Sequence, residues 1–107
     1  MRIGRRNWKG VKIAMTDNVK ALLPIGSVIR LRGAKRYMMI YGICQTERST
    51  QKEYDYIGVI WPEGNIGAKT HVLFQHADVE EILFTGLDNA ERRSFLEKLD
   101  RYYENRK

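Results

Sequence analysis

The side chains in this sequence that could take part in acid–base or metal chemistry are few. His71 and His76 are five residues apart, which is not the i,i+4 spacing that places two metal ligands on one helical face. The acidic residues Asp78, Glu80 and Glu81 follow closely, but we expect them to form a solvated turn rather than a metal or acid–base site. The sequence therefore predicts no metal-binding site in this region.

A nucleophile or a cofactor site is not indicated either. Cys44 is the single cysteine and lies in an apolar run, so we expect a small buried hydrophobe rather than a reactive thiol. It cannot form an internal disulfide, which favours a reducing compartment. Gly58, Gly64 and Gly67 match neither the Walker nor the dinucleotide-binding spacing. We therefore expect no catalytic residue, no cofactor and no enzymatic activity.

Aromatic side chains gather in two segments, 37–41 and 54–61, that we expect to be neighbouring strands. Such a cluster can stack the bases of single-stranded nucleic acid on a small β-barrel, or it can form a packed core, which is the commoner use of aromatic residues. Arg30 and Arg32, with the basic pair at 35–36, would supply a positive groove or simply a solvated face. A small nucleic-acid-binding barrel is therefore the alternative function.

The elements that must position these residues are mostly strands. Residues Val19 to Leu22 favour a short helical turn that Pro24 ends, and residues 76–81 a polar helical turn. The run 37–44 is apolar on both faces and is predicted to be a central strand covered on each side. We expect loops at 45–53 and 65–70. The predicted strands are 27–32, 37–44, 54–61, 71–74 and 82–85.

The C-terminal segment predicts an amphipathic helix. Asp88 and Glu91 have the spacing of a capping box, and apolar side chains from Phe95 to Tyr103 recur at helical intervals. This apolar stripe must be buried against the sheet or against a partner. We therefore expect an α+β fold, in which a small, twisted, mainly antiparallel sheet of four to five strands forms a roll or partial barrel with the C-terminal amphipathic helix.

Charge is distributed unevenly along the 107 residues, whose formal net charge is +6. The first 36 residues hold ten basic and one acidic side chain, and the remainder nine basic and twelve acidic.

We divide the chain into a basic N-terminal extension, 1–14, and a single α+β domain, 15–107. The codons of Lys9 to Val11 can read as a ribosome-binding site, so we expect natural translation to begin at Met15. A basic arm that binds bases or a membrane surface through Trp8 is the alternative.

Four stretches of the sequence resemble a known family. They read LLPIGSVIRLRG, MMIYGI, YDYIGVIWPEGNIG and VLFQHADVEEILFTG. In their order and spacing, from about Leu22 to Leu99, the chain resembles the small bacterial proteins of the domain-of-unknown-function family 4176. The resemblance implies a protein of Gram-positive bacteria encoded beside type VII secretion loci, near toxins with an N-terminal Leu-x-Gly domain. It implies a cytoplasmic accessory factor or chaperone that binds the toxin or its helical targeting partners, without catalysis.

Two surfaces are expected to receive such a partner: an apolar groove beside the C-terminal helix, or the rim at Trp61, Pro62 and Glu63. Aromatic residues are common interface anchors, and closure of the protein's own core is the alternative role for each of them. We expect a non-enzymatic adaptor with a protein partner, no nucleic acid and no membrane, and an undetermined oligomeric state. The predicted partner-binding residues are Tyr56, Trp61, Phe95, Leu99, Tyr102 and Tyr103.

Overall fold

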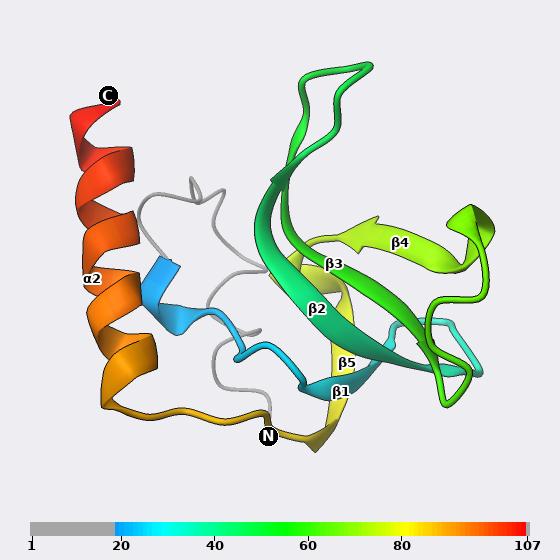
Figure 1. Cartoon of the computed structure of the whole chain (residues 1–107). Coiled ribbons are helices and arrows are strands. Elements are labelled where there is room, and N and C mark those ends of the chain that lie inside the picture. The colour runs from blue at the N-terminus through cyan, green and yellow to red at the C-terminus, as the bar shows by residue number, and fades with distance from the viewer. Residues whose placement is uncertain (1–18, 107) are drawn as a thin grey trace.

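The computed structural model describes residues 19–106, which form one five-stranded sheet and one long helix (Figure 1). All strand pairs are antiparallel, in the order β4-β3-β2-β1-β5, and the sheet is left open. This is the α+β fold that the sequence predicted. The elements are η2 (Val19–Ala21), β1 (Val28–Leu31), β2 (Tyr37–Thr46), β3 (Glu53–Trp61), η3 (Ala68–Thr70), β4 (His71–Phe74), η4 (His76–Asp78), β5 (Val79–Phe84) and α2 (Ala90–Asn105).

The proposed extension 1–14 and the start at Met15 lie outside the described residues. No described helix is both long and apolar enough to cross a membrane.

The two longest strands, β2 and β3, form a hairpin that bends the sheet. Ile40 pairs with Gly58 and Gly42 pairs with Ile57, which leaves Tyr41 as an extra residue on β2. A β-bulge of this kind increases the local twist and curvature of the bulged strand. The sheet therefore curls, with β2 at its centre, and its two edge strands, β4 and β5, follow one another in the chain.

The turn η4 connects these two edge strands and is tied to β3. The carboxylate of Asp55 accepts a hydrogen bond from the His76 backbone N–H at 2.7 Å. The Gln75 side chain accepts from the Asp55 N–H at 3.1 Å and donates to the Glu53 carbonyl at 2.9 Å. These bonds connect the turn to backbone and side-chain groups of β3, so the path of the chain from β4 to β5 is fixed.

The predicted turn at 76–81 is wrong in its second half, because β5 begins at Val79 rather than near Ile82. The polar composition of 78–81 suggested a turn. In the structure Val79 is buried and pairs with Leu31, and Glu81 pairs with Arg30 across the same two strands. Long-range pairing with β1 therefore overrides local composition.

The hydrophobic core lies inside the curled sheet. Its margin includes Leu23, Ile43 and Leu99, which are partly buried and pack against it. Tyr56, Ile29 and Ile40 have no exposed surface at all. The core residues are Val19, Leu22, Ile29, Met38, Ile40, Tyr56, Phe74 and Val79.

The N-cap of helix α2 lies one residue after the predicted N-cap, Asp88. Asn89 is the N-cap, and its side chain accepts from the Arg92 N–H at 2.9 Å. Asp88 instead accepts from the guanidinium groups of Arg92 and Arg93, at 3.2 and 3.4 Å. The predicted capping box of Asp88 and Glu91 is therefore wrong, because Asn89 takes the position of Asp88 and shifts the frame by one residue.

The helix stands beside the sheet and packs mainly on η2 (Figure 1). Leu96 and Tyr103 are buried, and Lys20 of η2 forms an ion pair with Glu97 at 3.3 Å. Because α2 lies at this position, β2 is central but is not covered on each side as predicted. Tyr37 and Tyr41, on its other face, remain 40% exposed.

Candidate protein-binding site

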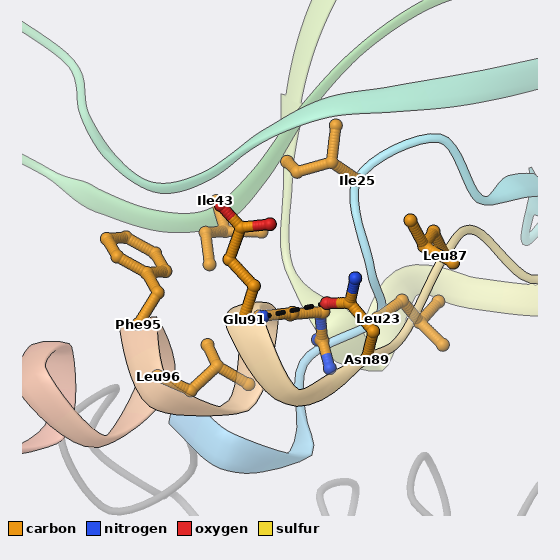
Figure 2. Close-up of a pocket in the computed structure, with 9 residues that line it drawn as sticks. Leu23, Ile25, Ile43, Leu87, Asn89, Glu91, Phe95 and Leu96 are labelled. Carbon is orange, nitrogen blue, oxygen red and sulfur yellow. Dashed lines mark hydrogen bonds between the residues drawn. The ribbon is translucent and has the colours of Figure 1, made fainter.

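A groove of about 540 Å³ opens between the first turns of α2 and the segment that precedes β1 (Figure 2). We call it the helix groove. Most of its lining is apolar, and polar groups come only from the start of α2 and its cap. The lining residues are Leu23, Ile25, Ile43, Leu87, Asn89, Glu91, Arg92, Phe95 and Leu96.

One wall of the helix groove is the segment 22–26, which the sheet holds in place. The Leu23 N–H donates to the Tyr56 hydroxyl at 2.8 Å, and the Gly26 N–H donates to the Ile40 carbonyl at 2.7 Å. Ser27 closes the turn by donating its N–H to the Pro24 carbonyl at 3.1 Å. These bonds fix the backbone on both sides of Ile25, so its side chain is presented by a defined turn.

The opposite wall is the link 85–89 and the start of α2, and two contacts join it to the first wall. The Arg92 guanidinium donates to the Leu22 carbonyl at 2.7 Å. The Gly86 N–H donates to the Ser27 hydroxyl at 3.0 Å. A Cβ atom at Gly86 would lie 2.1 Å from the Ile25 carbonyl oxygen, so only glycine permits this close approach. The groove is therefore bounded by two connected walls.

Three apolar side chains of the helix groove are unusually exposed to solvent. Ile25 is 48% exposed, Leu87 is 76% exposed and Phe95 is 52% exposed. Each leaves apolar surface in water, and burial of such surface is favourable by about 25 cal/mol per Å². Contiguous exposed apolar surface on a small protein commonly marks an interaction site.

A second groove, of about 500 Å³, lies on the outer face of the sheet, and we call it the sheet groove. Trp61 and Tyr37 are cross-strand partners at one side of it, and they are 44% and 40% exposed. Ile25 lines the helix groove, and its neighbour in the sequence, Gly26, lines the sheet groove. The sheet groove is lined by Gly26, Val28, Tyr37, Met39, Trp61, Leu83 and Phe84.

The structure separates the predicted partner-binding residues. Phe95 lines the helix groove and Trp61 lines the sheet groove. Tyr102 is 57% exposed but lines neither of these grooves. Tyr103 is buried and Leu99 packs against the core.

Tyr56 belongs to the interior. It has no exposed surface, and its hydroxyl bonds to the Leu23 N–H and lies 2.6 Å from His76 Nδ1. Its ring packs 5.3 Å from that of Phe74. Tyr56 is therefore a core residue that positions one wall of the helix groove, and we do not include it in a binding surface.

Sequence reasoning missed Ile25 and Leu87, the two most exposed apolar loop residues of the helix groove. Both lie in short segments bounded by Pro24, Gly26 and Gly86, where no strand or helix is available to bury them. A large aliphatic residue between turn-forming residues was the signal that could have identified them.

The histidines lie in separate hydrogen-bonded pairs. His71 Nδ1 is 2.5 Å from the Tyr41 hydroxyl, and its Nε2 is 2.8 Å from the Asn65 side-chain oxygen. His76 is buried beside Tyr56. Within residues 19–106, no three side chains of histidine, cysteine, aspartate or glutamate gather closely enough to hold a metal ion.

Burial raises the pKa of two side chains that could take part in chemistry, a carboxyl and a thiol. It raises the pKa of the Asp55 carboxyl, which accepts the His76 N–H. Cys44 was predicted to be buried, but it is only partly buried and packs against the core. This burial raises the pKa of Cys44 to about 11, and a hydrogen bond with Tyr103 only partly offsets the effect. A thiol with this pKa is protonated at neutral pH and is a poor nucleophile.

Three of the four basic side chains that could have formed a positive groove, all of them arginines, lie close to acidic side chains. Arg30 lies 3.1 Å from Glu81, and Arg36 lies 2.6 Å from Glu63. The Arg32 guanidinium is 3.9 Å from a carboxylate oxygen of β5 and donates to a carbonyl of η4. This pairing neutralises much of the charge that binding to nucleic acid would require.

The fold and the two grooves define a small α+β domain with preformed apolar surface grooves. Residues 22–95 match the sequence model of the family described as Domain of unknown function (DUF4176), and the chain belongs to that family. Comparisons with curated proteins and with solved structures gave no match. The matched residues include the complete sheet and the whole lining of the helix groove except Leu96.

Proposed function

We propose that this protein is a non-enzymatic cytoplasmic adaptor or chaperone that binds a type VII secretion effector of the Leu-x-Gly class, or the helical targeting partners of that effector. The helix groove is the binding surface. The resemblance to the family supplies the class of partner. The single observation that carries the proposal is the presence of three open apolar side chains, Ile25, Leu87 and Phe95, around one groove.

An amphipathic helix suits this groove chemically. Such a helix places apolar anchors at positions i, i+3 or i+4, and i+7 along one face, and it binds by laying that face into an apolar groove. The groove is about 540 Å³ and its walls are already joined, so little ordering of the protein is needed on binding. Binding there would bury Leu87, which is the most exposed of the large hydrophobic side chains described.

The experiment is an affinity capture from the native cytoplasm with the full chain, followed by mass spectrometry at low and moderate salt. Phe95→Ala is expected to lose the toxin or its helical partners, since a buried interface aromatic commonly contributes about 2 kcal/mol or more. Tyr102→Ala is the matched control, because Tyr102 is an equally exposed aromatic residue of the same helix that lies outside the groove.

Recovery of a Leu-x-Gly toxin or its targeting partner by the wild type and by Tyr102→Ala, but not by Phe95→Ala, would support the proposal. Equal recovery by all three proteins would place the partner elsewhere and refute the groove as its site. Recovery of nucleic acid alone, lost as salt rises, would refute the adaptor function and favour the nucleic-acid-binding alternative.

A further inference from the structure

The helix groove contains one charged side chain, that of Glu91, for which residues 19–106 supply no partner. Glu91 lines the groove and is exposed. Its carboxylate forms no hydrogen bond or ion pair with any other residue in the range 19–106. The N-cap is Asn89 rather than Asp88, so Glu91 is the second residue of the helix. The side chain of a capping box binds the N-cap backbone from the third residue, which is why Glu91 does not make this bond.

The other charge in the groove is already used. Arg92 donates to the Leu22 carbonyl at 2.7 Å and to Asp88 at 3.2 Å, and only 18% of its side chain is exposed. The Arg92 guanidinium is therefore held by Leu22 and Asp88, not by Glu91, and it stabilises the wall of the groove. Among residues 19–106, the charge in the groove that lacks a partner is the negative charge of Glu91.

The position of Glu91 makes this charge relevant to binding. In Figure 2 its side chain rises from α2 between Phe95 and Ile25, over the part of the groove where Ile43 lies. A ligand that covers the apolar walls would also cover the carboxylate. A buried charge without a partner is costly, so the ligand must supply a cation or leave the carboxylate open to water.

We propose that the segment bound by the helix groove is a basic amphipathic helix of a protein partner, in which one lysine or arginine stands among the apolar anchors and pairs with Glu91. This inference rests on the proposed function and adds the charge of the partner. It commits to a protein helix, because the apolar side chains of Ile25, Leu87 and Phe95 require anchors that a free cation lacks.

The test uses three labelled synthetic helices that share an 18-residue leucine-based amphipathic design and differ at one position beside the apolar face. That position is lysine, glutamate or norleucine. Binding to the full chain is followed by fluorescence anisotropy at low and high salt. We expect the lysine peptide to bind the wild type about two- to fivefold more tightly than the norleucine peptide, the range typical of a partly exposed ion pair.

Two variants of the protein make the test specific. Glu91→Lys is expected to reverse the preference in favour of the glutamate peptide, and Glu91→Gln to abolish it. Glu104→Gln removes the same charge at the far end of α2 and is expected to keep the preference for lysine. Circular dichroism of each variant checks that α2 persists, since an acid in the first turn also stabilises a helix.

The outcomes separate the two proposals. Equal binding of all three peptides, lost in Phe95→Ala, would keep the groove and overturn the pairing with Glu91. A lysine preference that survives in Glu91→Gln would also overturn it, by showing a general electrostatic effect. Binding of none of the peptides to the wild type would overturn both the groove and the pairing.

Discussion

Replacement of Tyr56 by phenylalanine is expected to destabilise the protein strongly, although the aromatic ring is retained. The Tyr56 hydroxyl accepts from the Leu23 N–H at 2.8 Å and lies 2.6 Å from His76 Nδ1. Burial raises the pKa of Tyr56 far above its ordinary value, so the phenol stays protonated and its hydroxyl is hydrogen-bonded to the imidazole. One hydroxyl thus joins β3 to the first wall of the helix groove and to η4.

The magnitude follows from the two groups that lose their partner. A buried polar group left without a hydrogen bond costs about 1–3 kcal/mol. Because the Leu23 N–H is only partly buried, the loss of both bonds in Tyr56→Phe should cost roughly 2–4 kcal/mol rather than the full sum. A domain of this size has a free energy of unfolding of about 5–15 kcal/mol, so a large share of the stability is at stake. The expected fall in Tm is on the order of 10–20 °C.

The assay is urea unfolding followed by far-UV circular dichroism. Tyr54→Phe is the matched control, because Tyr54 is a half-buried neighbour on β3 whose ring packs 5.1 Å from Lys52 Nζ. The control should stay within about 0.5 kcal/mol of the wild type. If Tyr56→Phe behaved like the control, the hydroxyl would not be holding these three segments, and our account of the groove wall would be wrong.

Three further variants or modifications test other parts of the structure. Burial raises the pKa of Asp55, so the folded chain binds a proton at this carboxyl more tightly than the unfolded chain does. The free energy of unfolding of the wild type should therefore fall as pH rises from about 4 through the raised pKa. Asp55→Asn should flatten this slope in urea unfolding between about pH 4 and 7, and an unchanged slope would contradict us. With a pKa of about 11, Cys44 should react with iodoacetamide at pH 8 about two orders of magnitude more slowly than free cysteine, and a rate near that of free cysteine would contradict the raised pKa. Gly86→Ala should cost about 3 kcal/mol or more, because its Cβ would lie 2.1 Å from the Ile25 carbonyl oxygen. Gly33→Ala, at a φ of +81° in open space, should cost only about 1 kcal/mol, and equal costs in thermal unfolding would argue against the close approach.

The sequence was informative about the elements because their signals are local. Alternation of apolar and polar residues identified β1, and the apolar run beginning at Tyr37 identified β2 as central. The recurrence of apolar residues after Phe95 identified α2. Each signal depends only on neighbours within one element, which is where periodicity is reliable.

The errors arose where distant segments decide the outcome. The first half of β5 reads as a polar turn and becomes a strand only because β1 is available to pair with it. The outer face of β2 was predicted to be covered, but α2 packs on η2 instead. Neither the position of a helix against a sheet nor the choice of strand partner can be derived from the composition of one segment.

The candidate site was predictable only in part for the same reason. Phe95 was identified because it lies on the apolar stripe of a helix, but the same stripe also contains Leu99, which packs against the core, and Tyr103, which is buried. Ile25 and Leu87 meet at the groove because two loops far apart in the sequence are joined by hydrogen bonds. The sequence therefore located one wall of the groove.

The strand order of the sheet also has a consequence for how the chain folds. The β2–β3 hairpin joins near neighbours, such as Ile43 and Tyr56, whereas the β1–β5 pair joins Arg30 to Glu81, 51 residues apart. Closing the longer loop costs on the order of 1 kcal/mol more conformational entropy, so the hairpin should form first and β5 should dock late. Mutation of Val79 is then expected mainly to accelerate unfolding, and mutation of Ile40 to slow folding, in stopped-flow measurements. Until β5 docks, the β1 edge is unpaired, and an exposed strand edge of this kind favours association between chains.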